Sequence, residues 1–223
     1  MRTAPAVPCP WPDGPACRAQ PDGRDVLTWA ADPPVRAIAT TVLGGGIGER
    51  RWLVNAEVAL GYDRPDPAAD AAEIGAALGL TGAGVGFLTA ARVRDVASAE
   101  DAGVRCDATV GISVPTWAAA PDGAWSEWAP GTINLVCWVP APLSDAALAN
   151  ALVTVTEAKT QALLEAGVPG TGTASDAVAV CCPAGGTEAY GGPRSVWGAR
   201  LARAVHAAVA EGTRRFLRVE GAS

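Results

Sequence analysis

The most regular pattern of apolar and polar positions in the chain lies between residues 144 and 166. On a helical wheel its apolar side chains fall on one stripe, made of Leu148, Leu152, Val155, Ala162, Leu163 and Ala166. Ser144 is a typical N-cap residue before this pattern, and Gly167 is a typical C-terminal stop after it. The pattern therefore predicts a helix that ends near residue 166.

Two charged residues of this helix have different expected environments. Lys159 falls in the middle of the apolar stripe, whereas Glu157 falls on the opposite stripe. A cation among apolar side chains must be paired, reach solvent or lose its charge, and Asp176 and Glu188 are its natural partners. We expect Lys159 to face inward, either as a structural ion pair or as a donor to a developing negative charge. Glu157 should face solvent unless another element covers it.

Short apolar runs bounded by turn residues predict strands elsewhere in the chain. We place them at about residues 25–31, 35–43, 50–58, 83–88, 93–98, 104–113, 131–139 and 175–182. Two more helices are expected at residues 68–79 and 195–212. Strands interrupted by only three helices predict an α+β fold, a mixed and largely antiparallel sheet covered by about three helices. It forms a single catalytic domain, residues 25–223, after an irregular proline-rich arm, residues 1–24.

The composition indicates a globular protein that binds neither nucleic acid nor membranes. Of its 223 residues, 49% are hydrophobic and 18% charged, and the mean hydropathy is +0.19. No apolar run approaches the roughly 18 residues of a membrane helix. The formal net charge is −6 and no cluster of Lys and Arg exceeds a pair, so a basic nucleic-acid surface is missing. The N-terminal stretch lacks the apolar segment of a secretory signal, and we expect a cytoplasmic protein of undetermined oligomeric state.

Cysteine and histidine do not indicate a metal site. The six cysteines form no CxxC pair, the only histidine is His206, and no HExxH motif is present. We interpret Cys137, Cys181 and Cys182 as core side chains that end apolar strands. A Ser-His-Asp or Cys-His site is disfavoured because no nucleophile motif accompanies His206. We expect no cofactor bound by the protein itself.

Two glycine-rich loops are candidate binding elements. Gly44-Gly45-Gly46 follows a predicted strand but lacks both the GxGxxG spacing and the Walker ending, so it is either a turn or a close approach to a ligand. The loop 171–176 combines small residues, hydroxyls and the carboxylate of Asp176. It either binds an anion or oxyanion, or uses its polar side chains to bond its own backbone.

Several short motifs occur in a fixed order along the chain. They are Leu43-Gly44-Gly45-Gly46, Asn55, Thr89-Ala90-Ala91, Gly131-Thr132-Ile133-Asn134, Thr156-Glu157-Ala158-Lys159-Thr160, Thr171-Gly172-Thr173 with Asp176, and Tyr190-Gly191-Gly192-Pro193. With this order and spacing, residues 38–212 resemble the adenosylcobinamide amidohydrolase (CbiZ) family. Two segments depart from the family pattern. Ile112-Ser113-Val114-Pro115 stands where an Asn is expected before the proline, and the loop 115–130 has three tryptophans that pack inward or line a cleft.

The resemblance implies hydrolysis of the amide that joins aminopropanol to a propionate arm of the corrin ring in adenosylcobinamide. The other product would be adenosylcobyric acid, in cobamide salvage, and cobalt would enter as part of this corrinoid substrate. The implied catalytic residues are Asn134, Glu157, Lys159, Thr173 and Asp176. The implied substrate-binding residues are Gly44, Gly45, Gly46, Asn55, Thr132, Thr171, Gly172 and Tyr190. The alternative is a corrinoid-binding protein without catalysis.

Two catalytic schemes are open for such a site. In the first, Glu157 or Asp176 activates a water molecule. Backbone N–H groups of the loop 171–176, with Asn134 or Lys159, then stabilise the oxyanion. In the second scheme, the Thr173 hydroxyl is a covalent nucleophile helped by a neighbouring amine or carboxylate.

Overall fold

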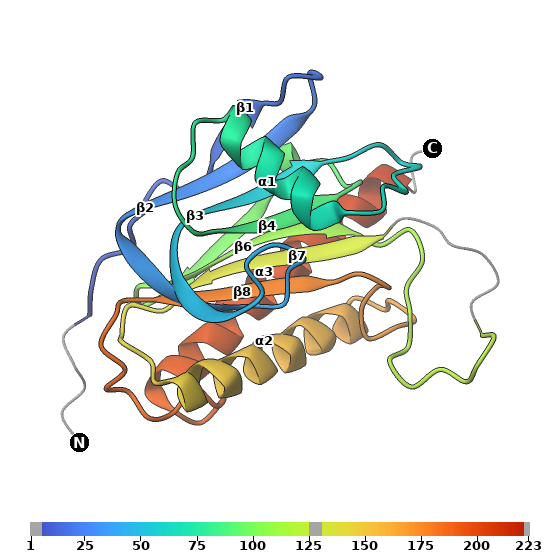
Figure 1. The fold of residues 1–223 in the computed structure, drawn as a ribbon. Helices are drawn as coiled ribbons and strands as arrows, with labels where there is room; N and C mark the ends of the chain where they lie inside the picture. The colour runs from blue at the N-terminus through green and yellow to red at the C-terminus, as the bar shows by residue number, and fades with distance from the viewer. Residues whose placement is uncertain (1–5, 125–130, 221–223) are drawn as a thin grey trace.

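One curved sheet of eight strands forms the centre of the protein (Figure 1). The computed structural model describes residues 6–124 and 131–220. The strands are β1 Ala16–Ala19, β2 Asp25–Ala39, β3 Gly46–Glu57, β4 Gly84–Thr89, β5 Ala97–Asp101, β6 Val104–Gly111, β7 Thr132–Trp138 and β8 Ala177–Cys182. They follow the order β4-β3-β2-β8-β7-β6-β5, and β1 pairs with β2 outside this path.

The strand directions and the helices confirm the α+β prediction. The pairs β3–β4 and β7–β8 are parallel, and the other five pairs are antiparallel. The α-helices of the described residues are α1 Pro67–Ala77, α2 Asp145–Glu165 and α3 Val196–Glu220, and Val93–Asp95 form a short 3-10 helix. No helix in this part of the chain is long and apolar enough to cross a membrane.

Local capping explains where two helices begin. The side chain of Asp66 accepts a hydrogen bond from Ala69 N (2.9 Å), and Pro67 occupies the first turn of α1. The Ser144 hydroxyl accepts from Ala147 N (3.2 Å) at the start of α2, as the sequence predicts. Each cap satisfies a backbone donor that the helix itself leaves unpaired.

The strand β2 corrects one expectation. The predicted strands 25–31 and 35–43 are a single strand, with a register shift against β3 between Ala30 and Val35. Asp32-Pro33-Pro34 lies between the two predicted strands, and proline cannot donate to a ladder. The shift places these residues where the ladder is already interrupted, so the strand continues.

Two further segments differ from the sequence expectation. The predicted strand 93–98 begins as the 3-10 helix, and β5 starts only at Ala97. Within the arm that was expected to be irregular, Ala16–Ala19 form a strand against β2, and Trp11 is buried in the core. The arm lacks a periodic pattern of its own because its order comes from packing on the sheet.

The sheet curves until its two halves face each other. Asn55 on β3 donates to Thr109 on β6 (2.9 Å), and Trp29 on β2 donates to Asp107 on β6 (2.9 Å). In a flat sheet β3 and β6, four positions apart, would be separated by roughly 19 Å. The inner side of the curve is therefore an enclosed space rather than an open face.

Apolar side chains fill both sides of this sheet. The helices α2 and α3 cover the outer face of one half, and α1 covers the outer face of β3 and β4 on the opposite side (Figure 1). Along β7 the residues alternate as a strand requires: Ile133 and Leu135 face the helices, whereas Asn134 and Val136 face the inside of the curve. This alternation places the polar side chain of Asn134 on the inner, concave side of the sheet.

Candidate active site

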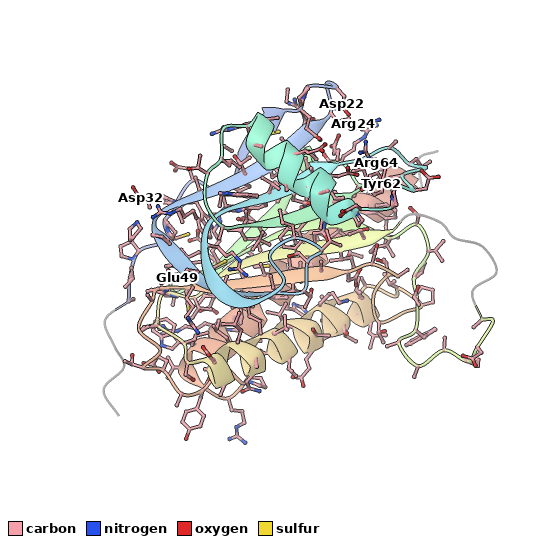
Figure 2. The ribbon with its side chains drawn as sticks, in the orientation of Figure 1. Asp22, Arg24, Asp32, Glu49, Tyr62 and Arg64 are labelled. Atoms are coloured by element: carbon pink, nitrogen blue, oxygen red, sulfur yellow. The ribbon has the colours of Figure 1, made fainter. Side chains whose placement is uncertain are left out.

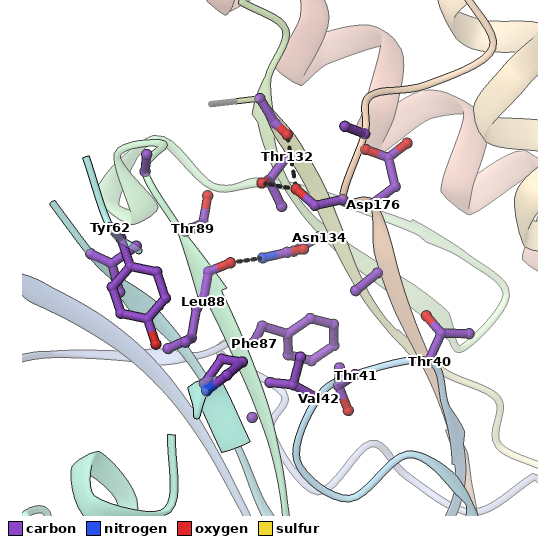
Figure 3. A pocket seen from close by; sticks show the side chains of 18 of the residues that line it. Thr40, Thr41, Val42, Tyr62, Phe87, Leu88, Thr89, Thr132, Asn134 and Asp176 are labelled. Atoms are coloured by element: carbon purple, nitrogen blue, oxygen red, sulfur yellow. Dashed lines mark hydrogen bonds between the residues drawn. The ribbon is translucent and has the colours of Figure 1, made fainter. Parts of the chain in front are cut away.

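A cavity of about 400 Å³ opens at one end of the curved sheet (Figure 3). Its walls come from the ends of β2 and β4, the starts of β7 and β8, and the loop after β3. Its polar lining consists of Thr40, Thr41, Tyr62, Thr89, Thr132, Asn134, Ser175 and Asp176. Asp176 is the only carboxylate among the described lining residues, so hydroxyl and amide groups dominate. Such a lining suits a neutral polar group of a ligand.

The amine of Lys159 meets Asp176 at the wall of this cavity. Lys159 lies on the buried stripe of α2 and donates to Oδ2 of Asp176, and the two side chains are only 9% and 12% exposed. The prediction of an inward-facing lysine is confirmed, and of the two expected partners, Asp176 and Glu188, the structure pairs it with Asp176. Gly172 packs directly over the pair: a Cβ at this position would lie 2.2 Å from Oδ2 and 2.5 Å from the lysine Nζ.

The carboxylate of Asp176 accepts hydrogen bonds from both the loop 171–176 and the start of β7, and so connects the two. Its Oδ1 accepts from Ile133 N (3.0 Å) and from the Thr173 hydroxyl, and its Oδ2 accepts from Thr173 N (3.1 Å) and from Lys159. The Thr173 hydroxyl also reaches Gly131 O (2.8 Å). These four donors match the four lone-pair positions of a carboxylate, so Asp176 is held rigidly.

A polar trio crosses the inside of the sheet beneath the cavity. Asn134 donates from Nδ2 to Asn55 Oδ1 (2.9 Å), and Asn55 donates from Nδ2 to Thr109 Oγ1 (2.9 Å). Figure 3 shows the further contact from Asn134 Nδ2 to Leu88 O (3.5 Å). All three side chains are buried, and Asn134 Oδ1 has no hydrogen-bond partner among the described residues. An unpaired buried acceptor costs about 1–3 kcal/mol, a cost more usual in functional sites than in a structural core.

The first residues of the loop 171–176 dock on another segment instead of the cavity. Thr171 N donates to Thr116 O (2.9 Å), Thr116 N donates to Gly172 O (2.8 Å), and the Thr171 hydroxyl accepts from Ala118 N (2.9 Å). The loop is thus held from both sides. Thr171 supports it, while Ala174, Ser175 and Asp176 face the cavity.

The structure does not bring every expected residue to this site. Glu157 is exposed and lines a separate groove between α2 and α3 with Arg203 and His206. Glu157 lies on the side of α2 near α3, whereas Lys159 lies on the side that reaches Asp176 at the cavity. Because the two side chains leave α2 on different faces, the helix does not present both of them to the cavity. Tyr190 is exposed on the loop after β8 and does not line the cavity.

Gly44 and Gly45 lie in the turn between β2 and β3, and Gly46 is the first residue of β3. Gly44 and Gly46 have φ values of +72° and +83°, and a Cβ on Gly44 would lie 2.0 Å from Gly84 O. Backbone geometry and close packing therefore explain these glycines without a ligand. The cavity is lined instead by the residues just before them, Thr40 to Val42.

Sequence reasoning missed Tyr62 as a lining residue. Its hydroxyl donates to Asp70, which also pairs with Arg64 (2.9 Å), and Figure 2 shows Tyr62 beside Arg64. Burial, followed by the hydrogen bond to Asp70, raises the pKa of Tyr62 to about 12. The only sequence signal was the polar turn after β3. Thr89 was also missed, although the motif that contains it was noticed.

The histidine, the core cysteines and Trp117 all lie outside the lining of the cavity. His206 bonds Glu165 (2.8 Å) on the surface of α2 and α3. No group of three or more His, Cys, Asp or Glu that could hold a metal occurs in the ranges 6–124 and 131–220. Cys137, Cys181 and Cys182 are buried, as expected of core thiols. Trp117 is exposed and does not line the cavity, whereas Trp125 and Trp128 lie outside the described residues.

Comparison with known proteins places these residues in a wider context. The family described as adenosylcobinamide amidohydrolase matches residues 12–220. An adenosylcobinamide amidohydrolase of Halobacterium salinarum is 39% identical over 132 residues, which are 58% of this chain and 55% of that protein. One of Methanosarcina mazei is 31% identical over 176 residues, 74% of this chain and 84% of that protein. An uncharacterised protein of Methanocaldococcus jannaschii is 35% identical over 89 residues, 36% of this chain and 35% of that protein. The chain thus aligns with about half of the Halobacterium protein and with most of the Methanosarcina protein.

Proposed function

Because the chain belongs to the adenosylcobinamide amidohydrolase family, we propose that it hydrolyses the amide between aminopropanol and the propionate arm of adenosylcobinamide. The products are aminopropanol and adenosylcobyric acid, cobalt enters with the corrinoid, and the reaction serves cobamide salvage. The observation that carries the proposal is the extent of the family match. It includes every strand and loop that lines the cavity of 400 Å³.

The loop before β8 supplies groups for the amide carbonyl. Ala174 and Ser175 are exposed and line the cavity, and their N–H groups donate to no other group in the described part of the chain. Adjacent free N–H groups on a rigid loop stabilise the oxyanion that forms when a nucleophile attacks a carbonyl. The bonds from Asp176 to Thr173 and Ile133 hold this loop in place.

Asp176 is the group proposed to activate water. The Thr173 hydroxyl lies near two acceptors, Gly131 O and Asp176 Oδ1, but it carries only one proton. When this proton turns to Gly131, a lone pair of Oδ1 becomes available to take a proton from water. Thr173 therefore positions Asp176 instead of attacking the substrate. The position of Glu157 in a different groove supports this choice of base.

Incubation with adenosylcobinamide followed by mass spectrometry tests the activity directly. The expected result is free aminopropanol with an equal amount of adenosylcobyric acid. Recovery of intact adenosylcobinamide from a tight complex would instead support a corrinoid-binding protein without catalysis.

Two variants test the assigned roles. Asp176→Asn should lower kcat by about 100-fold or more, the usual contribution of a general base. Thr173→Ala should keep measurable turnover and form no covalent adduct. A covalent acyl-enzyme on the wild-type protein, lost in Thr173→Ala together with all activity, would establish threonine as the nucleophile.

A further inference from the structure

Two exposed apolar side chains stand at the mouth of the cavity. Val42 lies in the turn between β2 and β3 and is 54% exposed, and Leu60 lies in the loop after β3 and is 70% exposed. Both line the cavity, and Figure 3 shows Val42 beside Thr41 at its edge. No other large exposed hydrophobic residue in the described part of the chain lines this cavity.

The fold gives no reason for apolar residues at these two positions. Neither Val42 nor Leu60 belongs to any of the three hydrophobic clusters of the core. Both occupy turns, where polar residues are usual because they bond the local backbone. Single exposed apolar residues are common on protein surfaces, but two that flank one cavity form a coherent apolar rim.

The size of the cavity indicates what this rim could contact. Cavities of roughly 300–1,000 Å³ enclose ligands of drug size, and this one is near the lower limit at about 400 Å³. A corrin macrocycle with its amide arms and adenosyl group is larger than such a ligand, so the ring remains outside when one arm enters. Leu60 also lines a neighbouring cavity of about 580 Å³, which shares Ala90, Gly131 and Thr132 with the first. Leu60 thus lines both cavities.

We propose that Val42 and Leu60 form the subsite that binds the corrin ring at the mouth of the cavity that the scissile arm enters. This inference rests on the proposed function, since it assigns a place to the rest of that substrate. The methyl-bearing edge and the broad face of the macrocycle cover both side chains and remove their apolar surface from water. The polar groups of the cavity then select the amide, while the rim contributes affinity for corrinoids as a class.

Serine substitutions with matched controls test the subsite. Val42→Ser and Leu60→Ser are compared with Val153→Ser and Leu164→Ser, whose parent side chains are 52% and 47% exposed on α2 and do not line the cavity. Dissociation constants for adenosylcobinamide are measured by equilibrium dialysis, and kcat by release of aminopropanol. From the exposed apolar area, Val42→Ser should weaken binding about 4-fold and Leu60→Ser about 10-fold, with kcat nearly unchanged. The controls should bind like the wild type.

The possible outcomes separate this inference from the proposed function. If the wild-type protein neither binds nor cleaves adenosylcobinamide, the proposed function fails, and the subsite fails with it. If the wild type cleaves the substrate but Val42→Ser and Leu60→Ser bind it as tightly as the two controls, only the subsite is refuted. If kcat falls while the dissociation constants stay unchanged, the rim does not bind the ring and the inference is also overturned. Unfolding temperatures of all four variants exclude a loss of structure.

Discussion

Replacing Gly172 by alanine should destabilise the protein by about 3 kcal/mol, because the site leaves no space for a methyl group. The new Cβ would lie 2.2 Å from Asp176 Oδ2 and 2.5 Å from Lys159 Nζ, whereas ordinary contacts begin at 3.4 Å. The carboxylate oxygen would therefore have to move by about 1 Å. A shift of this size weakens its bonds to both Lys159 and Thr173 N.

The magnitude follows from the burial of the ion pair. A hydrogen bond to a charged group contributes about 1.5–3 kcal/mol, and separating a buried pair leaves charges that solvent does not reach. Asp176 keeps its bonds to Ile133 and to the Thr173 hydroxyl, and the loop relaxes in part. Two weakened bonds with partial relaxation give the estimate of about 3 kcal/mol.

Urea unfolding followed by tryptophan fluorescence measures this loss. Gly61→Ala is the matched control, because a Cβ at Gly61 would meet no atom within 4 Å. The control should change the free energy of unfolding by less than about 0.5 kcal/mol. Gly172→Ala should lower it by about 3 kcal/mol, which corresponds to a fall in Tm of roughly 6–12 °C in thermal unfolding. Equal unfolding midpoints for the two variants would refute the tight packing of Gly172 over the pair.

Three further changes test other parts of the site. Thr109→Val should lower the free energy of unfolding by about 1–3 kcal/mol in urea, because it removes the acceptor of Asn55 Nδ2, and an unchanged midpoint would contradict the buried trio. The pKa of Tyr62 is raised from 10 to about 12, so its contribution to stability is complete below pH 10 and is lost between pH 10 and 12. When Tm is measured against pH, the wild type should show this loss and Tyr62→Phe should not. Identical Tm profiles for the two proteins would contradict the raised pKa of Tyr62. Glu157→Gln should keep kcat/KM within about two-fold, and a loss above about ten-fold would restore Glu157 as a candidate base.

Features that depend on neighbouring residues were accessible from the sequence. The α2 helix begins at its Ser144 cap and ends within one residue of the predicted boundary, because capping and a period of 3.6 are local properties. The same wheel placed Lys159 inward, and the cost of an unpaired buried cation indicated a carboxylate partner such as Asp176. The α+β class followed from the order of strands and helices alone.

Features that depend on distant segments were not accessible in this way. The strand β2 continues past Pro33 because β3 pairs on both sides of its register shift, which no local pattern reveals. The strand β1 orders only against β2. Likewise, Glu157 and the glycines at positions 44–46 were assigned to the site by sequence resemblance, but helix rotation and turn geometry place them elsewhere.

The chain by itself determined its helices, most of its strands and the inward position of one lysine, since backbone periodicity and desolvation act over short ranges or on single residues. Only the tertiary structure decided where the cavity opens. The curvature of the sheet brings Asn55 and Thr109, 54 residues apart, into hydrogen-bonding contact and sets Tyr62, Thr89 and Asn134 around one space. Strands twist by their own backbone sterics, but the two halves of this sheet meet only through clusters of side chains from distant segments, so no single segment of sequence specifies where the cavity opens.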